Sequence, residues 1–150
     1  MAKPPPPASS RFWKLFNAFG RLQVRLMRLT RGRVGARLMG VPVLVLHHRG
    51  RRSGHERETP LYYLDDGADF VVVASKGGTD THPAWFHNVM AMPETEVEVG
   101  GQRRRVRPRL ANAEERARLW PRLVELYPPY EEYQSFTSRE IPVVLLKPAG

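Results

Sequence analysis

Glycine and cationic residues that suit an anionic ligand come together in two short stretches of the chain. The first combines Gly50, Arg51, Arg52, Ser53 and Gly54 in one turn, followed by Arg57, Thr59 and Pro60. Glycine can adopt positive φ, which turns successive backbone N–H groups towards one anion. Arginine binds phosphate or carboxylate oxygens with two parallel N–H groups. The alternative is a hairpin loop with solvated charges, and these residues alone do not separate the two interpretations.

The second stretch contains Ser75, Lys76, Gly77 and Gly78, follows an apolar run, and repeats the combination of a cation with glycine. Neither stretch has the glycine spacing of a P-loop or of a dinucleotide-binding fingerprint. Each is a weak signal by itself. Two of them in one small chain predict a site for an anionic, phosphate-bearing ligand.

Aromatic residues accompany these stretches. Tyr127, Tyr130 and Tyr133 are spaced by three after a predicted helix end, and with Tyr62 or Tyr63 they would form a flat-walled pocket with several O–H donors. Core packing of the same rings is the alternative. In a predicted short helix, Trp85 and Asn88 lie three residues apart and can face the same side, although Trp85 also suits a core position.

Several classes of chemistry lack the residues they need. The chain has no cysteine, which excludes disulfides, thiolate catalysis and Cys-ligated metals. His47 and His48 are adjacent on a predicted strand and should point to opposite faces, and His82 and His87 are expected on different faces of a helix. No metal site and no nucleophile-elbow pattern is therefore predicted. If the chain is an enzyme, a bound cofactor carries the chemistry.

The positive charge is concentrated in the first part of the chain. Its 150 residues are enough for one domain, and the net charge is +9. Residues 1–60 carry 13 Lys and Arg against 2 Asp and Glu, a net of +11, so the remainder is slightly acidic. Such a field can attract nucleic acid, an anionic membrane surface or a polyanionic small molecule.

A proline-rich start and a basic amphipathic helix are predicted for residues 1–40, ahead of a domain at 41–150. The helix is expected over residues 11–30, with Ser9 or Ser10 as its N-cap. Its faces are apolar (Phe12, Leu15, Phe19, Leu22, Leu26) and basic (Lys14, Arg21, Arg25, Arg28). Such a helix either packs on the domain or lies in a membrane interface, and nucleic-acid binding is the least favoured alternative. Residues 30–40, with three glycines and three arginines, predict a linker.

From residue 41 onwards the hydrophobic pattern is mainly that of strands. Strands are expected at 43–48, 56–64, 68–75, 94–99, 102–110 and 141–147, and helical segments at 83–92, 112–127 and 130–136. Asn112 with Glu115 three residues later predicts a capping box. Short turns between successive strands predict an α+β, mainly β fold, with about six largely antiparallel strands closed into a small barrel.

Residues 42–148 resemble the deazaflavin-dependent nitroreductase family. The matching segments occur in order, at Gly50–Gly54, Thr59–Tyr62, Ala74–Gly78, Pro83–Asn88, Trp120–Pro121, Tyr127–Gln134 and Ile141–Pro142. The resemblance implies a split β-barrel of the FMN-binding type, the coenzyme F420, and an actinobacterial source. Phe86, Met92 and the pair His47 and His48 depart from the family pattern.

The resemblance also implies roles for particular residues. The basic turn and the 75–78 loop would hold the phosphate and acidic tail of F420, with help from Trp85 and Asn88. Residues at the family's substrate pocket would be Tyr62, Ser75, Tyr127, Tyr130 and Tyr133. A hydride would pass to a quinone or a nitroaromatic acceptor, and a quinone would explain a membrane-facing helix on a cytoplasmic protein. The alternatives are an FMN-dependent reductase or oxidase on the same barrel, or a non-enzymatic module that binds an anionic cofactor or nucleic acid.

Overall fold

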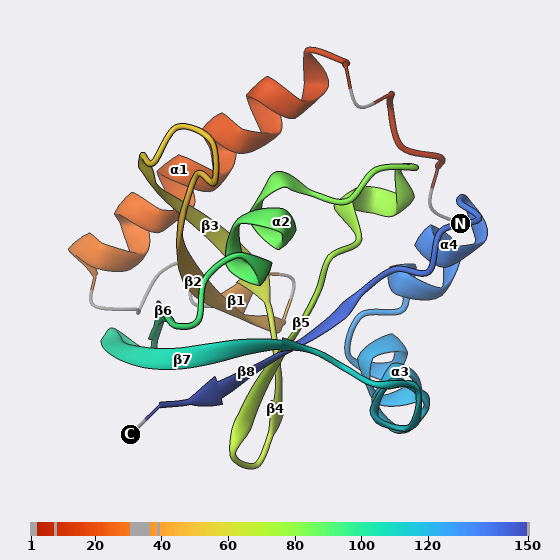
Figure 1. Ribbon diagram of the computed structural model, residues 1–150. Coiled ribbons are helices and arrows are strands. Elements are labelled where there is room, and N and C mark those ends of the chain that lie inside the picture. Colours follow the sequence, from red (N-terminus) through yellow and green to blue (C-terminus); the bar gives the residue numbers. More distant parts are fainter. Residues whose placement is uncertain (1–2, 8, 31–36, 39, 150) are drawn as a thin grey trace.

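A curled antiparallel β-sheet forms the centre of the molecule in the computed structural model, which describes residues 3–7, 9–30, 37–38 and 40–149 (Figure 1). The sheet contains eight strands within these residues. They are β1 (Arg37–Leu38), β2 (Val41–Arg49), β3 (Glu56–Tyr62), β4 (Leu64–Asp66), β5 (Asp69–Val73), β6 (Thr95–Val99), β7 (Gln102–Leu110) and β8 (Val143–Pro148). Every pairing between them is antiparallel, as predicted.

Strand β2 has the most neighbours in the sheet. It pairs with β1, with β3 along most of its length, and with β6. From β6 the sheet continues through β7, β8 and β5 to β4. The predicted hairpin of β6 and β7 is confirmed, and its turn uses positive φ at Gly100 and Gly101.

Two short strands account for the difference between the six strands expected and the eight observed. Strand β1 lies in the segment predicted as a linker, of which residues 31–36 and 39 fall outside the described part of the chain. The strand predicted at 56–64 breaks after Tyr62, and β4 begins at its last residue, Leu64, and extends to Asp66. There the chain leaves β2 and begins to pair with β5. At the break, Tyr63 packs edge-on against Phe70 with ring centroids 5.6 Å apart, so an aromatic contact lies at this corner.

Side chains along β2 alternate between two apolar layers. Leu44 and Leu46 belong to the inner core, together with residues of β5, β6, β7, β8 and α2 (Ala84–Met90). Val43 and Val45 point the other way and pack against α1 (Phe12–Leu29). This two-residue period is what a strand buried on both faces requires.

Helices α3 (Ala113–Leu126) and α4 (Pro129–Ser135) cover the outer face of β5 and β8. Leu119 and Leu123 of α3 are buried there. The predicted capping box is confirmed: Asn112 Oδ1 accepts a hydrogen bond from the Glu115 N–H at 2.8 Å, and Glu115 Oε1 accepts one from the Asn112 N–H at 3.0 Å. The cap satisfies backbone donors that the first turn of a helix cannot pair internally.

Helix α1 packs on the sheet, but not through its apolar face. Its N-cap residue is Arg11, not the predicted Ser9 or Ser10, although the Ser10 Oγ accepts from the Phe12 N–H at 3.2 Å. The buried residues are Gln23, Val24 and Met27. At Gly20 a Cβ would lie 3.3 Å from Cγ of Pro60, so a small residue permits the close approach of helix and β3. The apolar side chains remain exposed, namely Phe12, Leu15, Phe16, Phe19, Leu22, Leu26 and Leu29.

An ionic contact holds the C-terminal end of α1. Arg28 contacts Glu58 of β3 and Glu98 of β6, each at 2.7 Å, and these carboxylates raise the pKa of Arg28 above its ordinary value. Seen around the helix, the docking face is followed by the basic face and then by the exposed apolar face. Within the described residues, α1 and the other helices are too short or too polar to cross a bilayer.

A pair of aspartate substitutions tests which face of α1 is docked. Val24→Asp places a charge where the side chain is 3% exposed, whereas Leu22→Asp changes a side chain that is 53% exposed. We expect Val24→Asp to lower the free energy of unfolding by about 3 kcal/mol or to release α1, and Leu22→Asp to change it by less than about 0.5 kcal/mol. Urea unfolding and amide hydrogen exchange over residues 12–29 measure both, and equal effects would contradict the docking.

Candidate functional site

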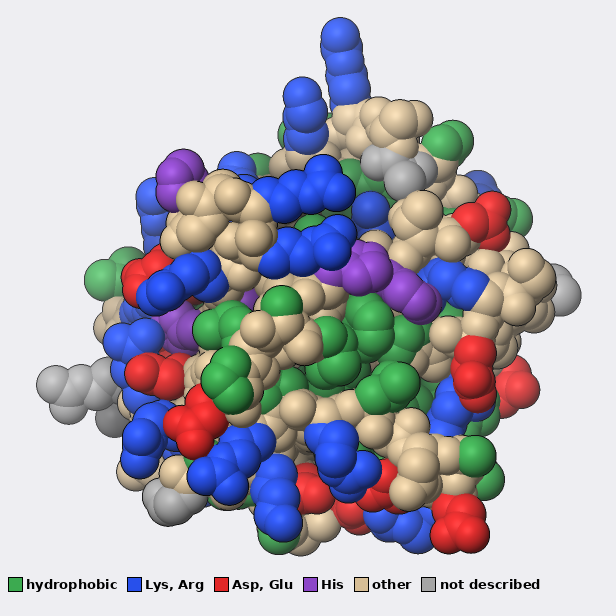
Figure 2. Space-filling model, in the orientation of Figure 1, with side chains coloured by type: hydrophobic (Ala, Val, Ile, Leu, Met, Phe, Trp, Pro, Cys, Tyr) green, Lys and Arg blue, Asp and Glu red, His purple; other side chains and the backbone are tan. Residues whose placement is uncertain are grey.

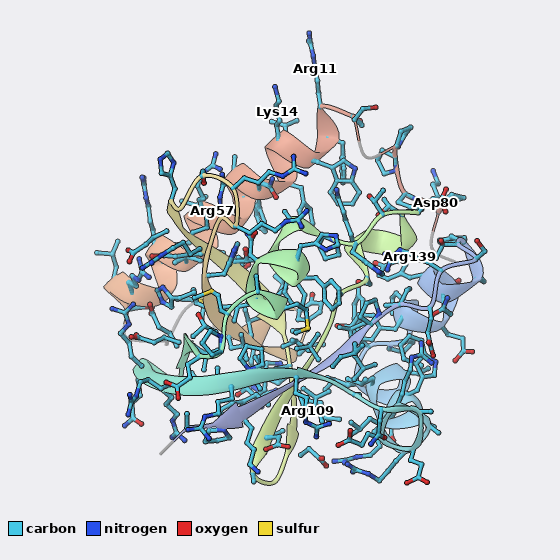
Figure 3. The ribbon with its side chains drawn as sticks, in the orientation of Figure 1. Arg11, Lys14, Arg57, Asp80, Arg109 and Arg139 are labelled. Carbon is cyan, nitrogen blue, oxygen red and sulfur yellow. The ribbon has the colours of Figure 1, made fainter. Side chains whose placement is uncertain are left out.

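The two glycine-containing stretches lie on either side of helix α2. The basic turn at 50–54 joins β2 to β3, and the 75–78 loop, which includes the 3-10 helix η1 (Lys76–Gly78), precedes α2 (Figure 1). Figure 3 labels Arg57 on the side of the basic turn and Arg139 on the side of η1. The structure therefore brings both predicted stretches to one region of the surface.

The basic turn is a closed loop. The Gly50 N–H donates to the His55 carbonyl at 2.9 Å, and the Gly54 N–H donates to the Gly50 carbonyl at 2.8 Å. Gly54 has φ +72, so the predicted use of positive φ is confirmed at this glycine. Ser53 does not project from the turn, because its Oγ accepts from the His55 N–H at 3.2 Å.

Four cations of the two stretches have no carboxylate partner among the described residues. In the described part of the chain, no Asp or Glu lies within ion-pair distance of Arg51, Arg52, Arg57 or Lys76. Figure 2 shows Lys and Arg side chains gathered on this face above an apolar centre, with histidine side chains between them. Unpaired guanidinium and ammonium groups beside apolar surface fit a ligand with an anionic tail and a flat ring.

A buried hydrogen-bond network lies beneath the basic turn. Asn88 of α2 accepts from the Arg51 N–H through Oδ1 at 3.1 Å, and its Nδ2 lies 3.0 Å from His48 Nδ1. The other ring nitrogen, His48 Nε2, lies 2.9 Å from Thr59 Oγ1. Burial, followed by the positive charge of Arg57, lowers the pKa of His48 from 6.5 to about 4. His48 is therefore neutral at physiological pH.

Left-handed backbone runs through the 75–78 loop. Lys76, Gly77 and Gly78 have φ of 44, 65 and 84. At Gly78 a Cβ would overlap the backbone of Tyr133, so this position needs glycine both for its φ and for the close approach of α4. The loop thus packs directly against the helix that carries the predicted tyrosines.

Arg139 holds the carbonyl side of the same loop. Its guanidinium donates to the carbonyl oxygens of Ser75 and Thr79, each at 2.7 Å, and of Ala74 at 3.3 Å. It also donates to Nδ1 of His82 at 2.9 Å. Burial lowers the pKa of Arg139, but the group stays charged, so a cation lies directly under the loop.

The start of the chain covers the outer side of the loop. Lys76 Nζ lies 5.4 Å from the ring centroid of Trp13, and a Cβ at Gly77 would lie within 3.5 Å of both Pro5 and Trp13. The indole N–H of Trp13 donates to the Pro7 carbonyl at 3.0 Å, which folds the proline-rich segment back onto the helix.

The predicted tyrosines form one cluster beside the loop. The ring of Tyr127 lies 4.8 Å from that of Tyr62 and 4.9 Å from that of Tyr130, and its hydroxyl lies 3.1 Å from that of Tyr133. Burial raises the pKa values of Tyr62, Tyr130 and Tyr133, so these phenols stay protonated and can donate hydrogen bonds. Tyr130 is 5% exposed and belongs to the core, whereas the other three are half-buried.

Some predicted site residues are mainly packing residues in this structure. Trp85 is 6% exposed and belongs to the inner core. Pro60 faces Gly20 of α1. The expected separation of His82 and His87 is wrong, because His82 precedes the helix and its ring lies 5.7 Å from that of His87. Even so, the described residues contain no cluster of three possible metal ligands.

Other residues were not anticipated from the sequence. Arg139 is separated from the loop that it binds by about sixty residues, and no local pattern connects the two. His82 and Trp13 were likewise not predicted to contact the loop or its clamp. The contacts of His48 with Thr59 and Asn88 have no local sequence signal and follow from the fold. The opposite orientations predicted for His47 and His48 are confirmed, since His47 contacts Glu98 instead.

Comparison with known proteins gives consistent results. A family model described as F420H(2)-dependent quinone reductase matches residues 19–148. The chain is 42% identical over 130 residues to an F420H(2)-dependent quinone reductase of Mycobacterium tuberculosis, covering 84% of this chain and 87% of the relative. A second protein of that species with the same family name is 44% identical over 108 residues, covering 72% of this chain and 91% of the relative.

Solved structures show the same fold. The F420-H2 dependent reductase FDR-A is 38% identical with a TM-score of 0.65, and the match covers 71% of this chain and 94% of that chain. A protein of Listeria innocua described as a pyridoxamine 5′-phosphate oxidase is 13% identical with a TM-score of 0.51, over 72% of this chain and 84% of that chain. The second likeness concerns the fold alone. Together they confirm the predicted split β-barrel.

The lowered pKa of His48 predicts a specific loss of stability in acid. Between pH 6.5 and about 4, the unfolded chain binds a proton at this position that the folded chain does not. Stability from this group is therefore complete above pH 6.5 and falls as the pH drops, by about 2 kcal/mol at pH 4.5. Urea unfolding at pH 7 and pH 4.5 measures how much the free energy of unfolding falls between the two pH values. We expect this fall to be about 2 kcal/mol larger in the wild type than in His48→Gln. Equal drops would contradict the prediction.

Proposed function

The chain belongs to the F420H(2)-dependent quinone reductase family, and from this premise we propose that it transfers a hydride from reduced F420 to a quinone-like acceptor. Family membership confirms the resemblance found in the sequence and identifies the chain as an oxidoreductase. The observation that carries the proposal is the group of cations around α2 that have no carboxylate partner among the described residues, beside a cluster of tyrosines. Nitroaromatic compounds are the second class of acceptor that we propose.

The cofactor-binding part of the site is proposed to be the basic turn, Arg57, Thr59, Asn88 and the 75–78 loop. Arg51, Arg52 and Lys76 would neutralise the phosphate and the acidic tail of the cofactor. Arg139 holds the carbonyl oxygens of Ser75 and Thr79, so the backbone of the 75–78 loop need not reorganise when a ligand binds. When bound, reduced F420 supplies the hydride from its deazaflavin ring.

The acceptor is proposed to bind against Tyr62, Tyr127 and Tyr133. Their rings offer flat apolar walls, and burial raises the pKa values of Tyr62 and Tyr133, so these two hydroxyl groups stay protonated at neutral pH. The hydrogen bond between Tyr127 and Tyr133 places two O–H groups 3.1 Å apart, so one can donate to a carbonyl oxygen of the acceptor while the other supports it. Ser75, next to Lys76 at the start of the loop that packs against α4, is a further candidate for the same role.

We also propose that residues 1–40 attach the enzyme to the inner face of the plasma membrane. Seven apolar side chains of α1 are exposed, although the helix is docked through a different face. The basic side chains Lys14, Arg21 and Arg25 lie next to them around the helix. Figure 3 shows Arg11 and Lys14 projecting away from the body of the protein. This arrangement suits an anionic bilayer, where apolar side chains enter the interface and cations meet the headgroups.

A fluorescence titration with oxidised F420, with FMN in parallel, tests the cofactor assignment. We expect saturable binding of F420 and a weakening of roughly 100-fold or more in Arg51→Ala/Arg52→Ala/Lys76→Ala, because three charge-assisted contacts are lost.

The matched control is Arg103→Ala/Arg105→Ala/Arg107→Ala, which removes the same number of charges from arginines that pair with glutamates on β6 or just before it. It should bind F420 within about threefold of the wild type. Preference for FMN, or equal losses in both triple variants, would count against the proposed site.

Co-sedimentation with anionic vesicles tests the membrane proposal. Leu15→Asp/Leu22→Asp removes two exposed apolar side chains of α1 and should weaken vesicle binding about tenfold or more. Leu110→Asp changes an exposed leucine on β7 and serves as the control. A chain lacking residues 1–40 that sediments as well as the full chain would show that α1 is not the anchor.

A further inference from the structure

We propose that His48 is a positioning residue that makes the Thr59 hydroxyl a hydrogen-bond donor to the anionic ligand of the site. The proposal rests on the proposed function only for the identity of that ligand. The arrangement itself follows from the polarity of a chain of hydrogen bonds from the basic turn to β3.

A backbone amide determines which groups donate and which accept along this series of hydrogen bonds. The Arg51 N–H can only donate, and it lies 3.1 Å from Asn88 Oδ1. This contact identifies Oδ1 as the acceptor and places the NH2 group of Asn88 towards His48, at 3.0 Å from Nδ1. An NH2 group can only donate as well, so Nδ1 of His48 must be the acceptor.

Because His48 accepts a hydrogen bond at one ring nitrogen, it donates one at the other. With Nδ1 accepting, the neutral ring carries its proton on Nε2. Nε2 lies 2.9 Å from Thr59 Oγ1, so the imidazole donates and the threonine oxygen accepts. A second proton on Nδ1 would face the NH2 group of Asn88, so the doubly protonated ring does not fit this network.

Thr59 is left with its own O–H group. A hydroxyl that accepts from His48 still has one proton to donate. Among the described residues none accepts it, since no hydrogen bond from Thr59 Oγ1 is present apart from the His48 contact. Thr59 and Arg57 are two apart on β3 and share a face, with Arg57 paired opposite His48 in the sheet. An anionic oxygen held by Arg57 can therefore also take the Thr59 proton.

The network makes this part of the site selective. If the imidazole accepted a hydrogen bond from Thr59 instead, the Thr59 hydroxyl would donate to His48 and could not donate to a ligand. The present polarity leaves only donors facing the ligand, which favours phosphate or carboxylate oxygens over groups that donate. Asn88 couples this choice to the backbone of the basic turn, because the Arg51 N–H orients the amide.

Nitrogen NMR of the ligand-free protein, with 15N-labelled histidine, tests the polarity without any cofactor. At pH 7 we expect the His48 ring to be neutral with its proton on Nε2. A proton on Nδ1, or a doubly protonated ring, would overturn the proposal. Asn88→Asp should place a proton on Nδ1, because a carboxylate at that position can only accept a hydrogen bond from the ring.

Two substitutions of His48 separate its two hydrogen bonds. Glutamine places its amide near Nε2 and can still donate to Thr59, whereas asparagine reaches only the Nδ1 position. In F420 titrations we expect Thr59→Val and His48→Asn each to weaken binding about tenfold, and His48→Gln to remain within about threefold of the wild type. The double variant His48→Asn/Thr59→Val should be no weaker than either single variant. Thermal unfolding checks that each variant is folded.

The failures of the two proposals differ in these measurements. If the wild type binds F420 but Thr59→Val binds it equally well, the role of His48 is overturned and the proposed function stands. If the wild type does not bind F420, the proposed function fails. Pyrophosphate is then the probe: weaker binding to Thr59→Val supports the donor arrangement, and equal or absent binding overturns it.

Discussion

The alternation of side chains along β2 is the constraint on which the rest of the structure depends. Leu44 and Leu46 point into the inner core, and Val43 and Val45 point towards α1. The same alternation carries on to the end of the strand, where His48 lies beneath the basic turn and His47 contacts Glu98 on the other side. A shift of register by one residue would exchange the two faces. One strand therefore positions the core, the helix and the hydrogen-bond network of the site.

Some cationic side chains of the protein form ion pairs with carboxylates, and others do not. On β7, arginines lie opposite glutamates of β6 or near Glu94 and Glu115, and their charges are balanced at the surface. Around α2, Arg51, Arg52, Arg57 and Lys76 have no such partners among the described residues. Exposed ion pairs contribute little to stability. The main consequence of the ion pairs on β7 is therefore that the positive charge there is neutralised, whereas the positive charge around α2 is not. Part of the excess charge therefore lies where the cofactor of the family is proposed to bind, and part lies on the basic face of α1.

The site combines loops with rigid supports. The 75–78 loop is fixed from beneath by Arg139, from the side by the backbone of Tyr133, and from outside by Trp13. The basic turn is tied to α2 through Asn88. Helix α1 contacts this loop with its first turn and exposes its apolar face along its length, so the same element links the proposed cofactor site with the proposed membrane surface. Preorganised loops of this kind lower the entropy that a ligand must overcome on binding.

What the sequence determined by itself was local. The β6–β7 hairpin, the capping box of α3, the helix at 12–29 and positive φ at Gly54, Gly77 and Gly78 depend on interactions among neighbouring residues, which a short window contains. Tertiary structure decided which strand β3 joins, which face of α1 docks, and why Gly78 must be glycine. It also brought Arg139 to a loop some sixty residues earlier and His48 to Asn88 and Thr59. These contacts depend on how the sheet curls, because the curl brings residues far apart in sequence within hydrogen-bond distance.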